Sequence, residues 1–196
     1  MYKTAVLIID MQNDFTRPDG RFFYPETSGA MMDSFAGKIN RMRALGAWIF
    51  VVYTAHDPQE KEINPELTHM FRDGKKASLI DGTEGAKLDE RIPYDPEKDV
   101  LWRKTMPSAF FGTDLADVLR KGGVENVLVC GVKTNVCCRA TATDAYQNRF
   151  KTFNLRDMLG TNTRELNEFH LAEMTKYFAA AIDSDEAIRR LIDGTF

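Results

Sequence analysis

Short apolar runs recur along the chain, separated by stretches in which apolar positions follow helical spacing. The run at residues 5–9 has no polar position, which is typical of a strand buried on both faces. Similar runs predict further strands at 47–53, 99–102, 126–130, 151–155 and 177–182. Helical patterns cover 27–45, 114–121, 135–149, 165–176 and 184–192. This alternation predicts an α/β fold with a mostly parallel sheet covered on both faces, and we expect one domain over 1–196.

Composition excludes several classes of function. Hydrophobic residues make up 43% and charged residues 28% of the chain, which is typical of a globular protein. The net charge of −3 and the absence of a basic run argue against nucleic acid or an anionic membrane as partner. No apolar stretch approaches the 18 residues or so of a membrane span. The three cysteines lie close together, which fits a reducing cytoplasm better than a disulfide framework.

Polar residues that could take part in catalysis follow three of the predicted strands. Asp10 follows the first strand, Lys104 follows the strand at 99–102, and Cys137 lies one turn after the strand at 126–130. Parallel strands place their carboxyl ends at one edge of the sheet, where ligands bind in open α/β folds. We therefore expect these three side chains to meet.

The residue types suggest nucleophilic catalysis. A cysteine at the start of a helix is placed where the helix dipole favours the thiolate, and free backbone N–H groups there bind an oxyanion. Asp10 would take the thiol proton, and Lys104 would lower the thiol pKa and stabilise negative charge. A buried structural cysteine beside a plain Asp10–Lys104 ion pair is the alternative that topology leaves open.

Three motifs then add a family resemblance. They are Leu7-Ile-Ile-Asp-Met-Gln-Asn-Asp-Phe15, Lys104-Thr-Met-Pro-Ser-Ala-Phe-Phe-Gly-Thr113 and Gly131-Val-Lys-Thr-Asn-Val-Cys-Cys138. In this order and spacing they resemble the signatures of the isochorismatase-like cysteine hydrolases. That family includes nicotinamidases, N-carbamoylsarcosine amidases, ureidoacrylate and biuret amidohydrolases, and isochorismatases. The resemblance implies a three-layer, Rossmann-like α/β/α sandwich around a mostly parallel six-stranded sheet.

The resemblance also implies a site and an activity. It assigns a catalytic triad to Asp10, Lys104 and Cys137, a cis peptide bond before Lys133, and an oxyanion hole to the backbone N–H groups of Lys133 and Cys137. The implied reaction is hydrolysis of a C–N bond in a small amide or ureide through a thioester, with release of ammonia or a small amine. No cofactor is implied, and we expect a cytoplasmic homo-oligomer, a dimer or a tetramer.

The chain departs from the metal-dependent members of the family. Nicotinamidases have an Asp-x-His metal motif after the second strand, and here Thr54 replaces the aspartate ahead of His56. Asp57, Glu60 and His69 are the remaining nearby ligand types, so we expect no metal. A metal-dependent nicotinamidase-like enzyme stays as an alternative, as does a non-catalytic binding protein.

Further residues near the motifs are candidates for substrate contact or for an alternative chemistry. Phe15, Phe110, Phe111 and His56 are expected to contact substrate. Cys138 is expected to be a small core residue, because adjacent helical residues face different directions. A thiol redox sensor using Cys137 and Cys138 is the remaining alternative.

Overall fold

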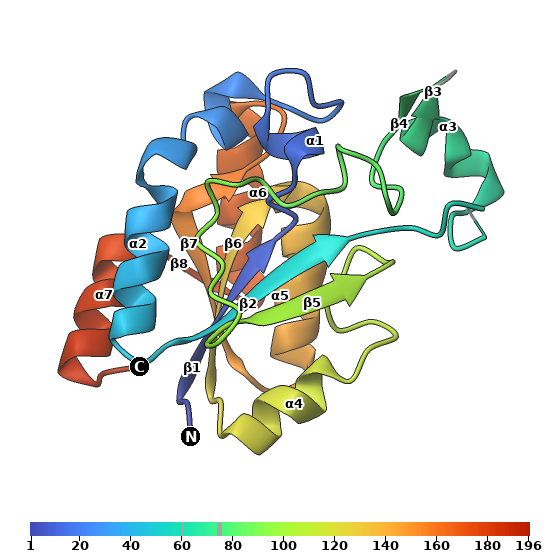
Figure 1. Cartoon of the computed structure of the whole chain (residues 1–196). Coiled ribbons are helices and arrows are strands. Elements are labelled where there is room, and N and C mark those ends of the chain that lie inside the picture. The colour runs from blue at the N-terminus through green and yellow to red at the C-terminus, as the bar shows by residue number, and fades with distance from the viewer. Residues whose placement is uncertain (60, 74–75) are drawn as a thin grey trace.

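The computed structural model describes residues 1–59, 61–73 and 76–196, and a six-stranded sheet lies at its centre. The strands are β1 (Thr4–Ile9), β2 (Trp48–Thr54), β5 (Val100–Lys104), β6 (Asn126–Val132), β7 (Lys151–Gly160) and β8 (Ala180–Ile182). Their order is β5-β2-β1-β6-β7-β8, and every neighbouring pair is parallel (Figure 1). The expected mostly parallel sheet is thus parallel throughout.

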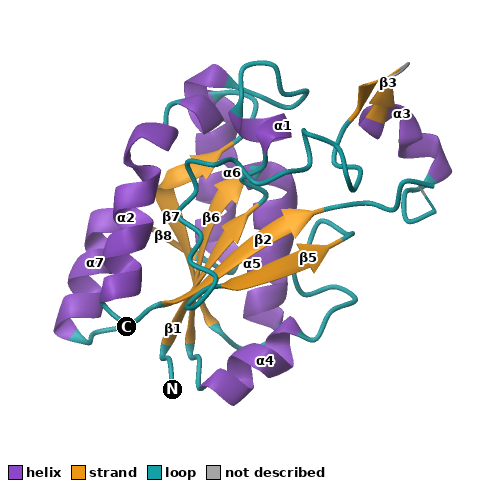
Figure 2. Cartoon of the chain, in the orientation of Figure 1, coloured by secondary structure: helices purple, strands orange, loops and turns teal. Residues whose placement is uncertain are grey.

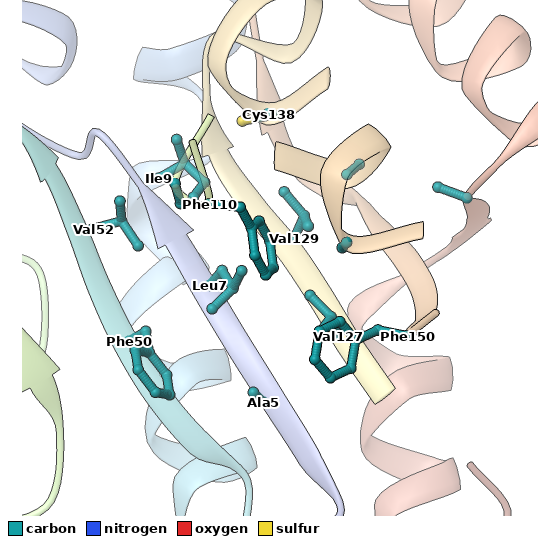
Figure 3. Packing of buried hydrophobic residues seen from close by; sticks show 14 of the residues in the cluster. Ala5, Leu7, Ile9, Phe50, Val52, Phe110, Val127, Val129, Cys138 and Phe150 are labelled. Atoms are coloured by element: carbon teal, nitrogen blue, oxygen red, sulfur yellow. The ribbon is translucent and has the colours of Figure 1, made fainter. Parts of the chain in front are cut away.

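Helices cover both faces of this sheet. Helices α2 (Met32–Ala44) and α7 (Ser184–Asp193) lie together on one face, and α4 (Leu115–Gly122), α5 (Arg139–Gln147) and α6 (Arg164–Tyr177) lie on the other (Figures 1 and 2). The side chains of β1 alternate between the two layers, because successive residues of a strand point to opposite faces. Val6 and Ile8 belong to the hydrophobic cluster that includes residues of α2, and Leu7 belongs to the cluster that includes residues of α4, α5 and α6 (Figure 3). This confirms the predicted three-layer α/β/α arrangement.

The remaining elements are short. They are the helices α1 (Asn13–Thr16) and α3 (Thr68–Phe71), the π-helical turns η1 (Pro25–Gly29) and η3 (Thr134–Cys138), the 3₁₀ turn η2 (Pro65–Leu67), and the antiparallel pair β3 (Arg72–Asp73) and β4 (Lys76–Ala77). Elements η2, α3, β3 and β4 lie in the polar connection between β2 and β5, to the upper right of Figure 1. Within the described part of the chain, no helix is both long and apolar enough to cross a membrane.

Several element boundaries differ from those expected. The helix expected over 27–45 starts at Met32, because the π-helical turn η1 precedes it. Strand β7 runs to Gly160 instead of 155, since the exposed Arg156 and Asp157 interrupt its apolar run before Met158 and Leu159 become buried again. The strand expected over 177–182 is confined to β8, because α6 continues to Tyr177.

The sheet brings two distant segments together at its centre. From β1 the chain adds β2 and β5 on one side, and then returns to add β6, β7 and β8 on the other. The order of strands therefore reverses between β1 and β6, and the crevice at such a reversal is the usual ligand site of open parallel sheets.

Candidate active site

Three buried side chains meet at the carboxyl ends of β1, β2 and β5. The side chains of Asp10 and Lys104 are 0% and 1% exposed, and Lys104 Nζ lies 2.9 Å from Asp10 Oδ2. Thr54 Oγ1 donates a hydrogen bond to Asp10 Oδ1 (2.9 Å) and accepts one from Lys104 Nζ (2.6 Å). The hydroxyl of Thr54 therefore links the two charged groups and holds both in place.

Cys137 reaches this group from the turn after β6. It lies in the π-helical turn η3, and α5 starts only at Arg139, so Cys137 is not in the first turn of an α-helix as expected. The Lys133 carbonyl accepts hydrogen bonds from the N–H groups of Val136 and Cys138. In an α-helix the donor to this carbonyl would be the N–H of Cys137, but the structure has the N–H groups of Val136 and Cys138 instead.

The Cys137 thiol lies close enough to Asp10 and Lys104 for both to act on its pKa. Burial raises the pKa of Cys137 to about 12, and although Lys104 lowers it, the charge of Asp10 raises it further. The expected effect of Lys104 is present, since it lowers the pKa of Cys137, but burial outweighs it. Burial lowers the pKa of Lys104, but its interactions with Asp10 and Cys137 outweigh burial and raise this pKa. The Lys104 amine therefore remains protonated.

A cavity of about 280 Å³ opens above these residues. Its volume suits a small molecule. Most of its wall is apolar. The wall is formed by residues from α1 and the loop after it, from β2, from the connection between β2 and β5, and from the ends of β5 and β6 and the turns after them: Phe15, Phe22, Thr54, His56, Glu62, Ile63, Asn64, Leu67, Phe71, Leu79, Lys104, Thr105, Met106, Pro107, Lys133, Val136 and Cys137.

Only one of the three phenylalanines predicted to contact substrate lines this cavity. Phe15 lines it and stacks on Phe22, with ring centroids 5.3 Å apart. Phe110 does not line it, because its side chain packs in the core near Leu7 and Val129 (Figure 3). Phe111 is 66% exposed and also lies outside the cavity wall. The expectation that these last two residues contact substrate does not fit their positions.

Lys133 precedes the turn η3 as its cap residue, and Cys138 is the last residue of η3. The peptide bond between Val132 and Lys133 is cis, and Lys133 lines the cavity. Cys138 is fully buried in the core cluster (Figure 3), where it packs as a small apolar residue.

Comparison with known proteins identifies the family of this chain. The isochorismatase domain family matches residues 4–186. The chain belongs to the isochorismatase family. Maleamate amidohydrolase of Pseudomonas putida is 29% identical, over 96% of this chain and 87% of its own. A probable inactive nicotinamidase of Arabidopsis thaliana is also 29% identical, over 87% of each chain. The crystal structure of an isochorismatase family protein from Desulfovibrio vulgaris superposes with a TM-score of 0.86 at 26% identity, covering 99% of this chain and 98% of that one.

The metal site of nicotinamidase-like members of the isochorismatase family does not fit the residues present. His56 is buried in the cavity wall, and its Nδ1 has no hydrogen-bond partner among the described residues. Burial lowers the pKa of His56, more than the charge of Glu62 raises it, so its ring is neutral. Thr54 is occupied by Asp10 and Lys104, His69 is exposed, and Glu60 lies outside the described residues. Among the residues that the structure describes, no group of three His, Cys, Asp or Glu side chains could hold a metal ion.

Two supporting residues of this isochorismatase-family site were missed from the sequence. Thr54 was considered only as the replacement for a metal ligand, although its place at the end of β2 marks it for the same edge as Asp10. The buried Gln12 donates to the carbonyls of Thr54 (2.7 Å) and Ala86 (2.6 Å) and accepts from the Thr54 N–H (2.9 Å). Gln12 therefore fixes Thr54 and ties the connection between β2 and β5 to the site. A glutamine in the loop after a buried strand was the available signal.

Proposed function

We propose that this protein is a cysteine-dependent amidohydrolase that cleaves a C–N bond in a small amide or ureido compound. The observation that supports this most directly is the contact of the Cys137 thiol with a buried Asp10–Lys104 pair at the edge of a small cavity. A cysteine, a base and a cation within reach of one bound carbonyl are the groups that acyl transfer through a thioester needs.

The raised pKa of Cys137 determines how the first step must run. Because the resting thiol is protonated, Asp10 takes its proton as the sulfur attacks the substrate carbonyl carbon. A C–S bond forms, and the carbonyl oxygen becomes an oxyanion in a tetrahedral intermediate. The C–N bond then breaks, and the leaving nitrogen takes the proton from Asp10, which leaves a thioester on Cys137 and releases ammonia or an amine.

The second half of the reaction reuses the same groups. Asp10 takes a proton from water, and the hydroxide adds to the thioester carbonyl. The C–S bond breaks, the sulfur regains a proton, and the acid product leaves. Lys104 stabilises Asp10 whenever its carboxylate is ionised, and it stabilises any transient charge on sulfur, because it lies close to both.

The oxyanion is assigned to backbone N–H groups of the nucleophile turn. We assign this role to Lys133, the cap residue before the turn Thr134–Cys138, and to Cys137, which lies within that turn. The π-helical geometry supports this, since it directs the Lys133 carbonyl to Cys138 and not to Cys137. Preorganised N–H donors of this kind contribute about 3–4 kcal/mol to transition-state stabilisation in acyl transfer.

The test is ammonia release from a panel of small carboxamides, carbamoyl amino acids and ureides. Wild type is compared with Cys137→Ala and with Cys138→Ala, a matched control in which the neighbouring buried thiol is removed. Turnover lost in Cys137→Ala and retained in Cys138→Ala is the expected result. Turnover that persists in Cys137→Ala would refute the cysteine mechanism, and silence of the wild type across the panel would favour a non-catalytic binding protein.

Location and assembly are also proposals. All three cysteines are free, which supports a reducing compartment such as the cytoplasm. Large apolar side chains are exposed at Phe111, Val136 and Phe169, which supports a homo-oligomer. Light scattering of the purified protein would test the second proposal, and a monomer at all concentrations would refute it.

A further inference from the structure

The cavity contains a second lysine that the proposed chemistry does not use. The side chain of Lys133 is partly buried, and the residue lines the same cavity as Cys137. Its backbone N–H is assigned to the oxyanion hole, but nothing in the reaction steps involves its amine. Within the described residues, Lys133 forms no ion pair.

The other ionisable groups of the cavity wall are already neutralised. Lys104 is paired with Asp10. Glu62 is paired with Arg103 (3.2 Å) and also accepts a hydrogen bond from a backbone N–H. His56 is neutral, because burial lowers its pKa. The Lys133 ammonium is therefore the one charge on the described cavity wall without a counter-charge.

The Lys133 amine has a defined place. Its Nζ lies 5.1 Å from the centroid of the Tyr24 ring, a cation–π contact. Asn162, just beyond β7, donates a hydrogen bond to the Tyr24 hydroxyl (2.9 Å) and so fixes the ring. An aromatic face orients a cation without neutralising it, so the hydrogen-bond donors of Nζ remain available to an anion.

Burial also favours an anionic partner for this amine. Burial lowers the pKa of Lys133, and negative charge on Cys137 acts in the opposite direction. An anion bound at Nζ would remove the cost of keeping this amine charged in a largely apolar cavity.

We propose that Lys133 binds an anionic group of the substrate, so that the substrate class is amides or ureides that also carry a carboxylate. The carbonyl to be attacked lies at Cys137, and the carboxylate lies at Lys133 against Tyr24. This inference rests on the proposed amidohydrolase function and adds a specificity-determining residue to it.

The experiment compares matched substrates that differ only in the anionic group. Succinamic acid, maleamic acid and N-carbamoyl-β-alanine are each paired with the N,N-dimethylamide of the same acid, which is neutral and releases no ammonia from its tertiary amide. The ratio of kcat/KM for acid over neutral partner is measured in wild type, Lys133→Gln, Lys133→Arg and Lys176→Gln. Lys176 is the control, because its Nζ also lies 5.1 Å from a tyrosine ring, that of Tyr177, but outside the cavity.

The inference predicts that wild type prefers the acid of at least one pair. A hydrogen bond to a charged group corresponds to roughly 10- to 100-fold in binding. The preference should fall by about this factor in Lys133→Gln, chiefly through KM, remain in Lys133→Arg and be unchanged in Lys176→Gln. An equal ratio in wild type and Lys133→Gln, or turnover of neutral partners only, would overturn the inference while leaving the amidohydrolase proposal intact.

Calorimetric titration tests the Lys133 proposal separately from the amidohydrolase proposal. Acids and neutral partners are titrated into Cys137→Ala protein and into the Cys137→Ala/Lys133→Gln double variant, where no turnover is needed. Tighter binding of an acid that is lost in the double variant supports the Lys133 assignment even if hydrolysis is not observed. Equal binding of acid and neutral partner in both proteins refutes it, whatever the activity of the wild type.

Discussion

The buried pair of Asp10 and Lys104 gives the most quantitative prediction. Their side chains are 0% and 1% exposed and 2.9 Å apart, with the hydroxyl of Thr54 as a shared partner. Lys104→Met leaves the Asp10 carboxylate buried without its positively charged partner, although the hydrogen bond from the Thr54 hydroxyl remains. Asp10→Asn leaves the Lys104 ammonium buried in the same way. Removing one partner of a buried ion pair costs about 3–5 kcal/mol of unfolding free energy, so each single variant should be strongly destabilised.

The double variant Asp10→Asn/Lys104→Met should be more stable than either single variant. Asparagine is close in shape to aspartate, and methionine is close in length to lysine, so the packing is largely preserved. No unpaired charge remains, and the Thr54 hydroxyl still has the asparagine oxygen as an acceptor. Replacing a buried pair by neutral groups of similar volume is often nearly neutral in stability. We therefore expect a coupling free energy of about 2 kcal/mol or more in the double-mutant cycle.

Urea denaturation at pH 7.5 measures all four proteins. Trp48 and Trp102 pack against the core, so their fluorescence reports on its loss, and far-ultraviolet circular dichroism reports on the helices. Coincident transitions by the two probes would justify two-state free energies. If the losses in the single variants add to the loss in the double variant within about 0.5 kcal/mol, the pair is not energetically coupled and this reasoning is refuted.

Three further predictions follow from named contacts. With a pKa of about 12, Cys137 should be alkylated by iodoacetamide at a rate that rises about tenfold per pH unit from pH 7 to 10, and a plateau near neutral pH would contradict the assigned thiol state. Burial opposes ionisation of Asp89, but hydrogen bonds from Arg91 and Thr16 lower its pKa from 3.8 to about 2. Its stabilisation is thus present above about pH 4 and lost as pH falls through 2, so Asp89→Asn should cost about 2 kcal/mol in denaturation at pH 7 and almost nothing at pH 2. Thr54→Val should lower kcat by roughly 10- to 100-fold with little change in KM, and Thr54→Ser should restore it; equal losses in both variants would show that the hydroxyl is not what matters.

Much of the fold could be predicted because its signals are local. A fully apolar run such as residues 5–9 is compatible with a central strand, and the alternation with helical segments requires a parallel sheet. Parallel strands then align their carboxyl ends, so Asp10 and Lys104 were placed together without knowledge of strand order. The missed end of β7 shows the limit, since Arg156 and Asp157 are exposed within a strand whose later residues are buried.

Several features of the site could not be predicted, because they depend on three-dimensional packing that the sequence does not reveal. Phe110 and Phe111 are adjacent, yet one side chain is in the core and the other is exposed, because direction depends on the local backbone. The lowering of the Cys137 pKa by Lys104 could be predicted, but the stronger effect of burial, which raises this pKa, could not, because the extent of burial is not visible in the sequence. Thr54 was misjudged because its partners lie 44 and 50 residues away.

The backbone itself explains why Asp10 and Cys137, 127 positions apart, share one site. At Gly131, near the end of β6, a Cβ atom would lie 2.1 Å from the carbonyl oxygen of Ile9, and φ is +109°, so only glycine allows this approach. Directly after β1, Asp10 has φ of +51°, a left-handed conformation that aspartate tolerates better than most residues. These two conformations occur side by side at the reversal of strand order, where β1 and β6 pair. Unfavourable backbone conformations persist where the surrounding structure imposes them, and they are concentrated at functional sites. The close approach of β1 and β6 therefore belongs to the same arrangement as the contact between the Asp10 carboxylate and the Cys137 thiol.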